Sequence, residues 1–162
     1  MSAALEGIIP MREADPETLA LLIAETMVTA DRGSGEWKKA RSILFDSSHS
    51  GIAAYEIIQP ALRSGRREVR RMTARWLLSE LATKAQYGNK ILDMIEERLG
   101  NDDDQVTVRG CIAQMPVVYA RRPGQARRIM VMAMEYPHDS VQEALIRAMH
   151  RAGMADKLPE AK

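Results

Sequence analysis

The sequence predicts an all-α protein of about eight helices, and three observations lead to this prediction. Apolar residues recur at spacings of three and four along most of the chain, as they do on one face of an α-helix. Strict alternation of apolar and polar residues, the pattern of a half-buried strand, is absent from the sequence. Aromatic residues make up only 4% of the 162 residues, so aliphatic side chains and methionine must fill a core of helices packed on helices.

Three helices are expected in the first part of the chain. Residues 15–17 (Asp-Pro-Glu) predict a helix start, because aspartate caps unpaired N–H groups, proline fits the first turn and glutamate favours the positive end of the helix dipole. Two further helices are expected at about residues 36–46 and 52–64. Pro60 is predicted to kink the later one, since proline removes a backbone hydrogen bond.

The second part of the chain predicts five more helices, each with an apolar stripe of helical period. They run over about residues 69–81, 91–99, 102–119, 126–134 and 141–152. Pro116 is expected to kink the third of these five helices, and Gly153 to end the last. The chain is expected to form a single domain, residues 1–162, with irregular ends over 1–14 and 154–162.

Equivalent stripes recur along the chain and indicate a stack of helix pairs. The dipeptides Val69-Arg70, Val108-Arg109 and Val141-Gln142 each begin a similar stripe, and the starts are 39 and then 33 residues apart. A single helix pair cannot bury both of its faces, so pairs that repeat with this period stack side by side.

The repeated pattern resembles that of the HEAT-repeat family. The resemblance rests on Val-Arg-x-x-x-Ala at residues 69–74 and 108–113, on the acidic residues 102–104 and on prolines within helices, and it covers mainly residues 65–153. It implies a right-handed α–α superhelix of stacked antiparallel helix pairs. Gln142 stands where the pattern has arginine, and a plain helical bundle is the alternative architecture.

Charge and cysteine content narrow the functional classes. The net charge of +1 provides no overall field that would attract the chain to DNA or to an anionic membrane. One cysteine excludes an internal disulfide, and no apolar run reaches the length of a membrane span. Residues 1–17 lack the basic and apolar regions of a secretory signal. A cytoplasmic protein without membrane contact is expected.

An arginine-rich helix over residues 63–75 is the most unusual local feature. Arg67, Arg71 and Arg75 are spaced so that a regular helix places them opposite the core. They are candidates for contact with phosphates or with an acidic partner. The alternative is a solvated helix face in which arginine serves as a good helix former.

Candidate residues for contact with a protein partner lie on two later helices. Asp93 and Glu97 are one turn apart on the expected solvent face of their helix. In the methionine-rich run that follows Arg128, Val131 and Met132 fall off the core stripe, which favours a contact with a partner or with a second copy. A helix buried between its neighbours is the other interpretation.

No group of residues with catalytic or metal-binding spacing is evident. Cys111 lies in an apolar stripe, which indicates a buried thiol, and the three histidines lack metal-ligand spacing. We expect no catalytic residue, metal or cofactor, and predict a non-catalytic protein-binding or scaffold module. Nucleic-acid backbone binding through residues 63–75 is the alternative function. A glycosylase for alkylated bases, which some HEAT-like proteins resemble, is a third, with Trp37 and Trp76 as its aromatics.

Overall fold

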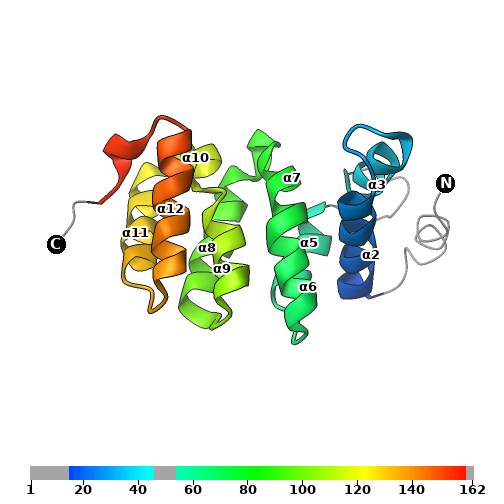
Figure 1. Ribbon diagram of the computed structural model, residues 1–162, viewed down its shortest axis with the longest axis horizontal. Helices are drawn as coiled ribbons and strands as arrows, with labels where there is room; N and C mark the ends of the chain where they lie inside the picture. The colour runs from blue at the N-terminus through cyan, green and yellow to red at the C-terminus, as the bar shows by residue number, and fades with distance from the viewer. Residues whose placement is uncertain (1–14, 46–53, 160–162) are drawn as a thin grey trace. The chain divides into compact units, whose positions relative to one another are not determined.

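The computed structural model describes residues 15–45 and 54–159, and within them every regular element is helical (Figure 1). Among these residues, eight helices are longer than four residues when the contiguous segments α6, η2 and α7 are counted as one, and the four-residue α10 is an additional short helix. The expectation of an all-α protein is therefore confirmed. The described residues form two compact units that divide between Leu81 and Ala82, here called unit 1 and unit 2.

Unit 1 begins with helix α2 (Pro16–Thr29), whose start follows the sequence prediction. The Asp15 carboxylate accepts hydrogen bonds from the backbone N–H groups of Glu17 and Thr18, at 3.1 and 3.3 Å, and so satisfies two N–H groups of the first turn. Helices α3 (Gly35–Phe45) and α5 (Ala54–Leu62) follow, and both pack on α2. The end expected for the first of these helices at residue 46 and the start expected for the second at residue 52 lie outside the described residues.

The last helix of unit 1 differs from a regular α-helix. It consists of α6 (Arg67–Met72), a π-helical turn η2 (Thr73–Leu77) and α7 (Leu78–Ala82). The Leu78 N–H bonds to the Thr73 carbonyl five residues back, so the turn holds one residue more than an α-helical turn.

This wide turn changes which side chains face the core. In the apolar stripe expected over residues 69–81, Val69, Thr73, Leu77 and Leu81 are fully buried, whereas Met72 and Trp76 are only half-buried. Ala74 and Leu78, which lie outside that stripe, are fully buried as well. The stripe was therefore predicted in part, and from Thr73 onward the wide turn departs from the rotation of about 100° per residue that the prediction assumed.

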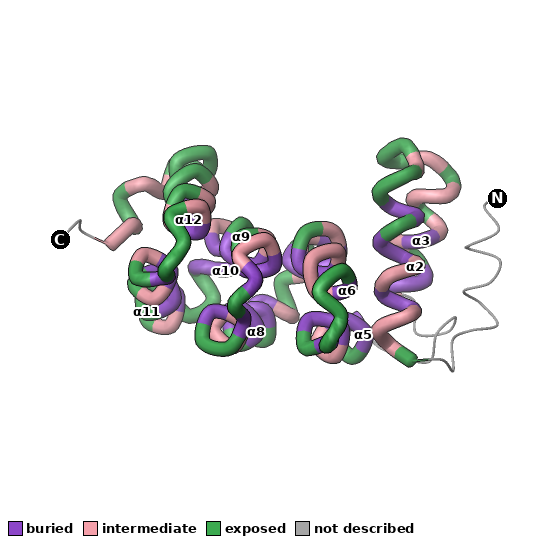
Figure 2. Tube along the Cα trace, turned by 60° about the horizontal axis from the view of Figure 1, so that its bottom comes forward, coloured by how far each residue is buried: buried purple, intermediate pink, exposed green. Residues whose placement is uncertain are grey.

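Unit 2 contains five helices joined by short turns. They are α8 (Gly88–Asn101), α9 (Gln105–Ile112), α10 (Met115–Val118), α11 (Pro123–Met134) and α12 (Asp139–Arg151). Helix α8 packs on α9 and α11, and α12 packs on α9 and α11. Along each helix, buried and exposed residues alternate with the helical period (Figure 2). The buried side chains on these faces form the core of the unit.

The expected kinked helix over residues 102–119 is two helices. Helix α9 ends at Ile112, and the Gln114 N–H bonds to the Cys111 carbonyl three residues back, which closes the last turn. Pro116 lies in the first turn of the short helix α10, where its missing N–H has no cost. The prediction of a kink was wrong because the chain ends one helix and starts another.

The end of unit 2 is more ordered than the sequence indicated. Gly153 has a φ of +69° and ends α12, and the Met154 N–H bonds to the Met149 carbonyl at 2.8 Å. A 3₁₀ turn, η5 (Ala155–Lys157), follows where irregular chain was expected. The expectations for residues 1–14 and 160–162 lie outside the described part.

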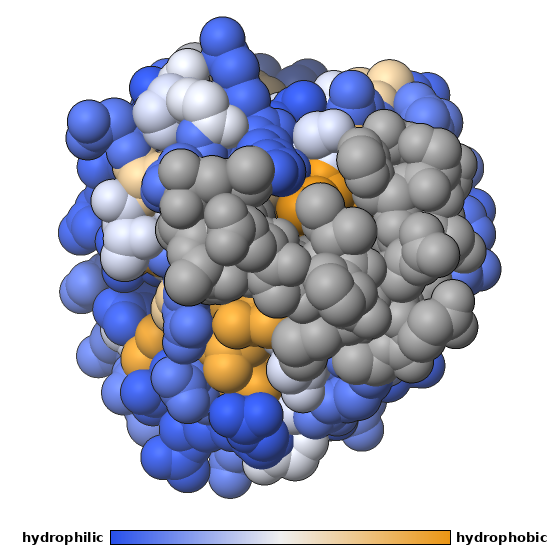
Figure 3. All heavy atoms as spheres, turned by 90° about the vertical axis from the view of Figure 1, so that its right-hand side faces the viewer, coloured by the Kyte–Doolittle hydropathy of each residue, from blue (hydrophilic) through white to orange (hydrophobic). Residues whose placement is uncertain are grey.

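No helix in the described ranges is both long and apolar enough to cross a membrane. Figure 3 views the molecule from the α2–α3 end of unit 1, and the described side chains visible there are mostly polar with small hydrophobic areas.

Candidate functional site

The candidate site lies along α11, which carries three of the predicted contact residues. Met130 and Ala133 are fully buried against the rest of unit 2. Val131 is 41% exposed, Met132 is half-buried and Arg128 is exposed. Because successive helical residues are about 100° apart, Val131 and Met132 open into two different hollows instead of forming one surface.

A charged seam joins α8 and α11 along one side of the candidate site. The Arg128 guanidinium donates two hydrogen bonds to the Glu96 carboxylate, from Nε at 3.2 Å and from Nη2 at 2.9 Å. Gln125 Nε2 donates to Asp93 Oδ1 at 2.8 Å and to Glu96 Oε1 at 3.1 Å. The hydrogen bond from Arg128 lowers the pKa of Glu96, and Glu96 in turn raises the pKa of Arg128.

The seam also engages both carboxylates that the sequence put forward as partner contacts. Arg122 Nη1 lies 3.4 Å from Asp93 Oδ1, and Arg98 Nη2 lies 2.8 Å from Glu97 Oε1. The expected acidic face of α8 is therefore partly neutralised by arginines of the same unit. The seam surrounds a shallow hollow of about 540 Å³. Sequence reasoning missed Glu96 and Gln125, the two residues at its centre.

Met132 lines a hollow of about 560 Å³, here called the Met132 hollow. Its other walls are residues 99–103, from the end of α8 and the turn after it, and residues 135–138, between α11 and α12. The Tyr136 hydroxyl donates a 2.7 Å hydrogen bond to the Asp102 carbonyl and so ties the two walls together. Burial and then the negative charges of the aspartates at 102–104 raise the pKa of Tyr136.

Val131 lines a smaller hollow of about 360 Å³, here called the Val131 hollow. It is walled by Tyr119, Arg127 and residues 156–159, which include Leu158 and Pro159. Arg127 Nη1 donates to the Tyr119 hydroxyl at 3.4 Å. The hollow therefore combines apolar side chains with a charged rim, the composition of many protein interfaces.

The predicted arginine ridge lies in unit 1. Arg67 and Arg75 are exposed, and Arg71 is half-buried. The π-helical turn (Thr73–Leu77) contains Arg75, so the three arginines do not follow the regular spacing that the prediction assumed. The Arg75 guanidinium lies over the Trp76 ring, 5.1 Å from its centre.

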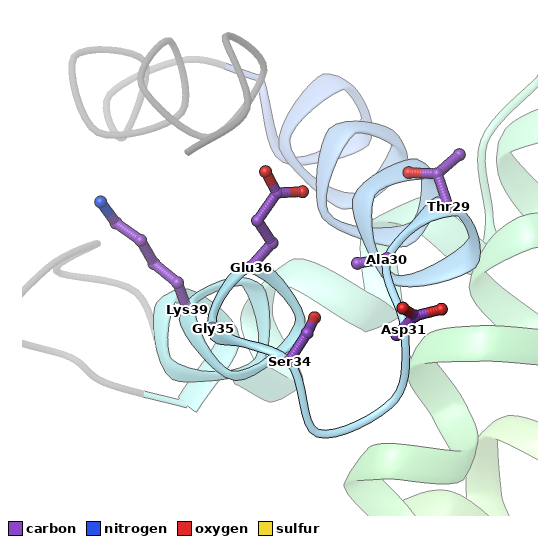
Figure 4. A pocket seen from close by; sticks show the side chains of 7 residues that line it. All are labelled: Thr29, Ala30, Asp31, Ser34, Gly35, Glu36 and Lys39. Carbon is purple, nitrogen blue, oxygen red and sulfur yellow. The ribbon is translucent and has the colours of Figure 1, made fainter.

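A further hollow of unit 1, of about 640 Å³, lies where α2 ends and α3 begins. Its lining includes Thr29 from the end of α2, Asp31 and Ser34 from the connecting turn, and Glu36 and Lys39 from α3 (Figure 4). The Glu36 and Lys39 side chains extend outward from α3 rather than converging on a common point.

The cysteine and two of the aspartates of unit 2 take part in the packing and the hydrogen bonds of the fold. Cys111 is fully buried, and burial raises the pKa of its thiol to about 12. Asp102 accepts a backbone hydrogen bond from Asp104, and Asp104 caps α9 by accepting from the Thr107 N–H and hydroxyl. Among residues 15–45 and 54–159, no group of three or more histidine, cysteine or acidic side chains is placed to hold a metal ion.

The fold and these surfaces define an all-helical protein with shallow surface hollows around an amphipathic helix, α11. No family model, no curated protein sequence and no solved structure matches the chain.

Proposed function

We propose that this protein is a non-catalytic protein-binding module of the helical-repeat type. Support comes from the packing within unit 2, where the pairs α8–α9 and α11–α12 lie against each other through α8 with α11 and α9 with α12. Two successive layers of a helical stack would pack in this way, and such stacks serve mainly as binding surfaces. A cytoplasmic location belongs to the same proposal, because a lone buried thiol fits a reducing compartment.

The exposed apolar side chain of Val131 is the observation that carries the proposal. It is 41% exposed on a helix whose opposite face is fully buried, and it opens into a hollow with Tyr119 and Leu158. Arg127 and Lys157 stand at the rim. An apolar centre with a charged rim favours a contact in which a partner's apolar side chain displaces water from the hollow.

The burial and the hydrogen bonding of the ionisable groups support a non-catalytic role. The Cys111 thiol is protonated at neutral pH and fully buried, so it is a poor nucleophile. The Asp102 and Asp104 carboxylates are buried and hold the start of α9. Their hydrogen bonds give them a structural task.

The test compares Val131→Lys with Val28→Lys. Val28 lies on α2 in unit 1 and is 43% exposed, so the two variants introduce the same change at nearly equal exposure. Affinity capture from cells, quantified by mass spectrometry, should lose specific partners with Val131→Lys and retain them with Val28→Lys. Equal recovery with both variants would refute the assignment of the Val131 hollow.

A second candidate, nucleic-acid backbone binding, is favoured by the exposed arginines of α6 and η2. Arg67 and Arg75 are exposed, and Arg75 stacks on the half-buried Trp76, an arrangement that also suits contact with unpaired bases. Glu68 is the one acidic residue within positions 63–75.

The test of the second candidate is fluorescence anisotropy with labelled duplex and single-stranded DNA at low salt. The double variant Arg67→Gln/Arg75→Gln should weaken binding more than Arg147→Gln/Arg151→Gln, which removes two exposed arginines of α12. Binding should also fall steeply as salt rises, since phosphate contacts release counterions. If the wild-type protein binds neither DNA at low salt, the second candidate is dismissed.

A further inference from the structure

The Met132 hollow has a negative electrostatic potential, because the C-terminal ends of two helices lie at it. Its lining includes the last three residues of α8, Leu99 to Asn101, and Glu135, the residue that caps the end of α11. The carbonyl end of a helix carries a partial negative charge that favours nearby cations. Helix α11 has no basic residue in its last turn to offset this charge. In α8 the offsetting residue, Arg98, is already engaged by Glu97 and Asp102.

Two carboxylates on opposite walls strengthen this field. Asp103 belongs to the turn after α8, Glu135 belongs to the end of α11, and both residues are exposed. Burial raises the pKa of Tyr136, which lies between these walls, and the negative charges of the aspartates at 102–104 raise it further. The hollow therefore presents exposed carboxylates to a group that enters from solvent.

The N-terminal ends of α9 and α12, which carry partial positive charges, lie nearby, and an acidic residue offsets each of these charges. Asp104 caps the start of α9, and Asp139 occupies the first turn of α12. His138 is the basic side chain among the lining residues. The acidic residues outnumber it, so the field of the hollow remains negative.

The floor of the hollow is apolar enough to receive a long side chain. Its lining includes the half-buried Met132, the buried Tyr136 and the exposed Pro137. Arginine and lysine lay their methylene stems on such surfaces while the charged head reaches polar groups. Methionine adapts its shape to the groups that it contacts.

We propose that the Met132 hollow binds an arginine or lysine side chain of a partner protein, with the stem on Met132 and Tyr136 and the cation between Asp103 and Glu135. This inference rests on the proposed protein-binding function and adds the chemistry of the partner. Arginine is the better occupant, because its planar fork can engage a carboxylate through two hydrogen bonds.

The experiment titrates the ¹⁵N-labelled protein with a short blocked peptide, acetyl-Gly-Gly-Arg-Gly-Gly-amide. A peptide with citrulline in place of arginine is the control, since it keeps the length and planarity and lacks the charge. Saturable shifts of amide resonances from residues 99–103, 132 and 135–138 are expected with arginine, with binding about two- to fivefold tighter than with citrulline.

Isosteric variants then locate the cation. Asp103→Asn with Glu135→Gln should remove the preference for arginine, whereas Glu143→Gln, which neutralises an exposed carboxylate of α12, should leave it intact. Circular dichroism melting curves that match the wild type would show that the double variant folds.

Three results would overturn this inference. They are the absence of arginine-dependent shifts, equal binding of the citrulline peptide, and a preference that survives in the Asp103→Asn/Glu135→Gln variant. Self-association in light scattering that this variant abolishes would also overturn it, because the occupant would then be a second copy of the chain. The Val131→Lys comparison tests the proposed function separately, so partner loss there with no peptide binding here would refute only the basic-side-chain proposal.

Discussion

Thr73 of unit 1 and Thr107 of unit 2 are both fully buried inside a helix, and their hydroxyl groups have opposite surroundings. Thr107 in α9 is fully buried, and its hydroxyl donates a 2.7 Å hydrogen bond to the Asp104 carboxylate. Thr73 in the π-helical turn is also fully buried, yet its hydroxyl has no hydrogen-bond partner within the described residues. A buried polar group contributes to stability when it is bonded and costs free energy when it is not.

The comparison shows how the two units fix local geometry. In unit 2, buried hydrogen bonds hold the turn between α8 and α9, through Asp102, Asp104, Thr107 and Tyr136. In unit 1, a wide turn brings Ala74 and Leu78 into the core and leaves the Thr73 hydroxyl unsatisfied. We infer that a polar network specifies one region and apolar packing the other.

The largest expected effect is the loss of the α9 cap. Asp104→Ala should lower the free energy of unfolding by about 2–3 kcal/mol, because it removes the cap and leaves the buried Thr107 hydroxyl without an acceptor. Urea denaturation measures this change. Asp104→Asn keeps an oxygen acceptor and should lose less. An Asp104→Ala variant as stable as the wild type would show that the polar network does not stabilise the protein.

Thr107→Val should destabilise the protein by about 1–2 kcal/mol. The change keeps the branched shape and removes the hydroxyl, so the Asp104 carboxylate loses a buried donor. The same urea titration measures it. A neutral result would mean that the 2.7 Å bond adds nothing beyond the cap itself.

Thr73→Val, unlike Thr107→Val, should raise the free energy of unfolding, by about 1 kcal/mol. The substitution removes an unbonded hydroxyl from the core while a methyl group fills nearly the same space. A loss of stability of the size found for Thr107→Val would show that the Thr73 hydroxyl is bonded in solution, and the contrast between the units would disappear.

The smallest effect is expected at the seam between α8 and α11. Glu96→Gln should cost less than about 1 kcal/mol at pH 7, because Arg128 is largely exposed and water screens the pair. The folded protein lowers the pKa of Glu96, so the contribution is present above the ordinary pKa of glutamate and is lost as the pH falls through the lowered value. Wild type and variant should therefore converge in acid, and a difference that grows in acid would contradict this sign.

Local signals made much of the fold predictable. The Asp15 cap placed the start of α2, and Gly153 placed the end of α12, because each acts through its own backbone neighbourhood. The π-helical turn could not be predicted, since its apolar residues suit a regular helix as well. Whether a wide turn is favourable depends on contacts with α2 and α5, which the sequence alone does not reveal.

The candidate site was predictable only in part. The positions of Val131 and Met132 off the core stripe follow from their helical angle, but their separation into two hollows depends on the turns that flank α11. The seam has a signal that sequence reasoning overlooked. Acidic residues at 93, 96 and 97 share one face of α8, and Gln125 and Arg128 share one face of α11. Pairing these faces requires knowing that the two helices are neighbours.

Site-specific photo-crosslinking tests the central claim, that the Val131 hollow contacts a partner protein, most directly. A benzoylphenylalanine residue would replace Val131 in one sample and Val28, at nearly equal exposure, in the other. The account predicts a discrete crosslinked product from position 131 and none from position 28. Equal products from both positions, or a product from position 28 alone, would contradict it.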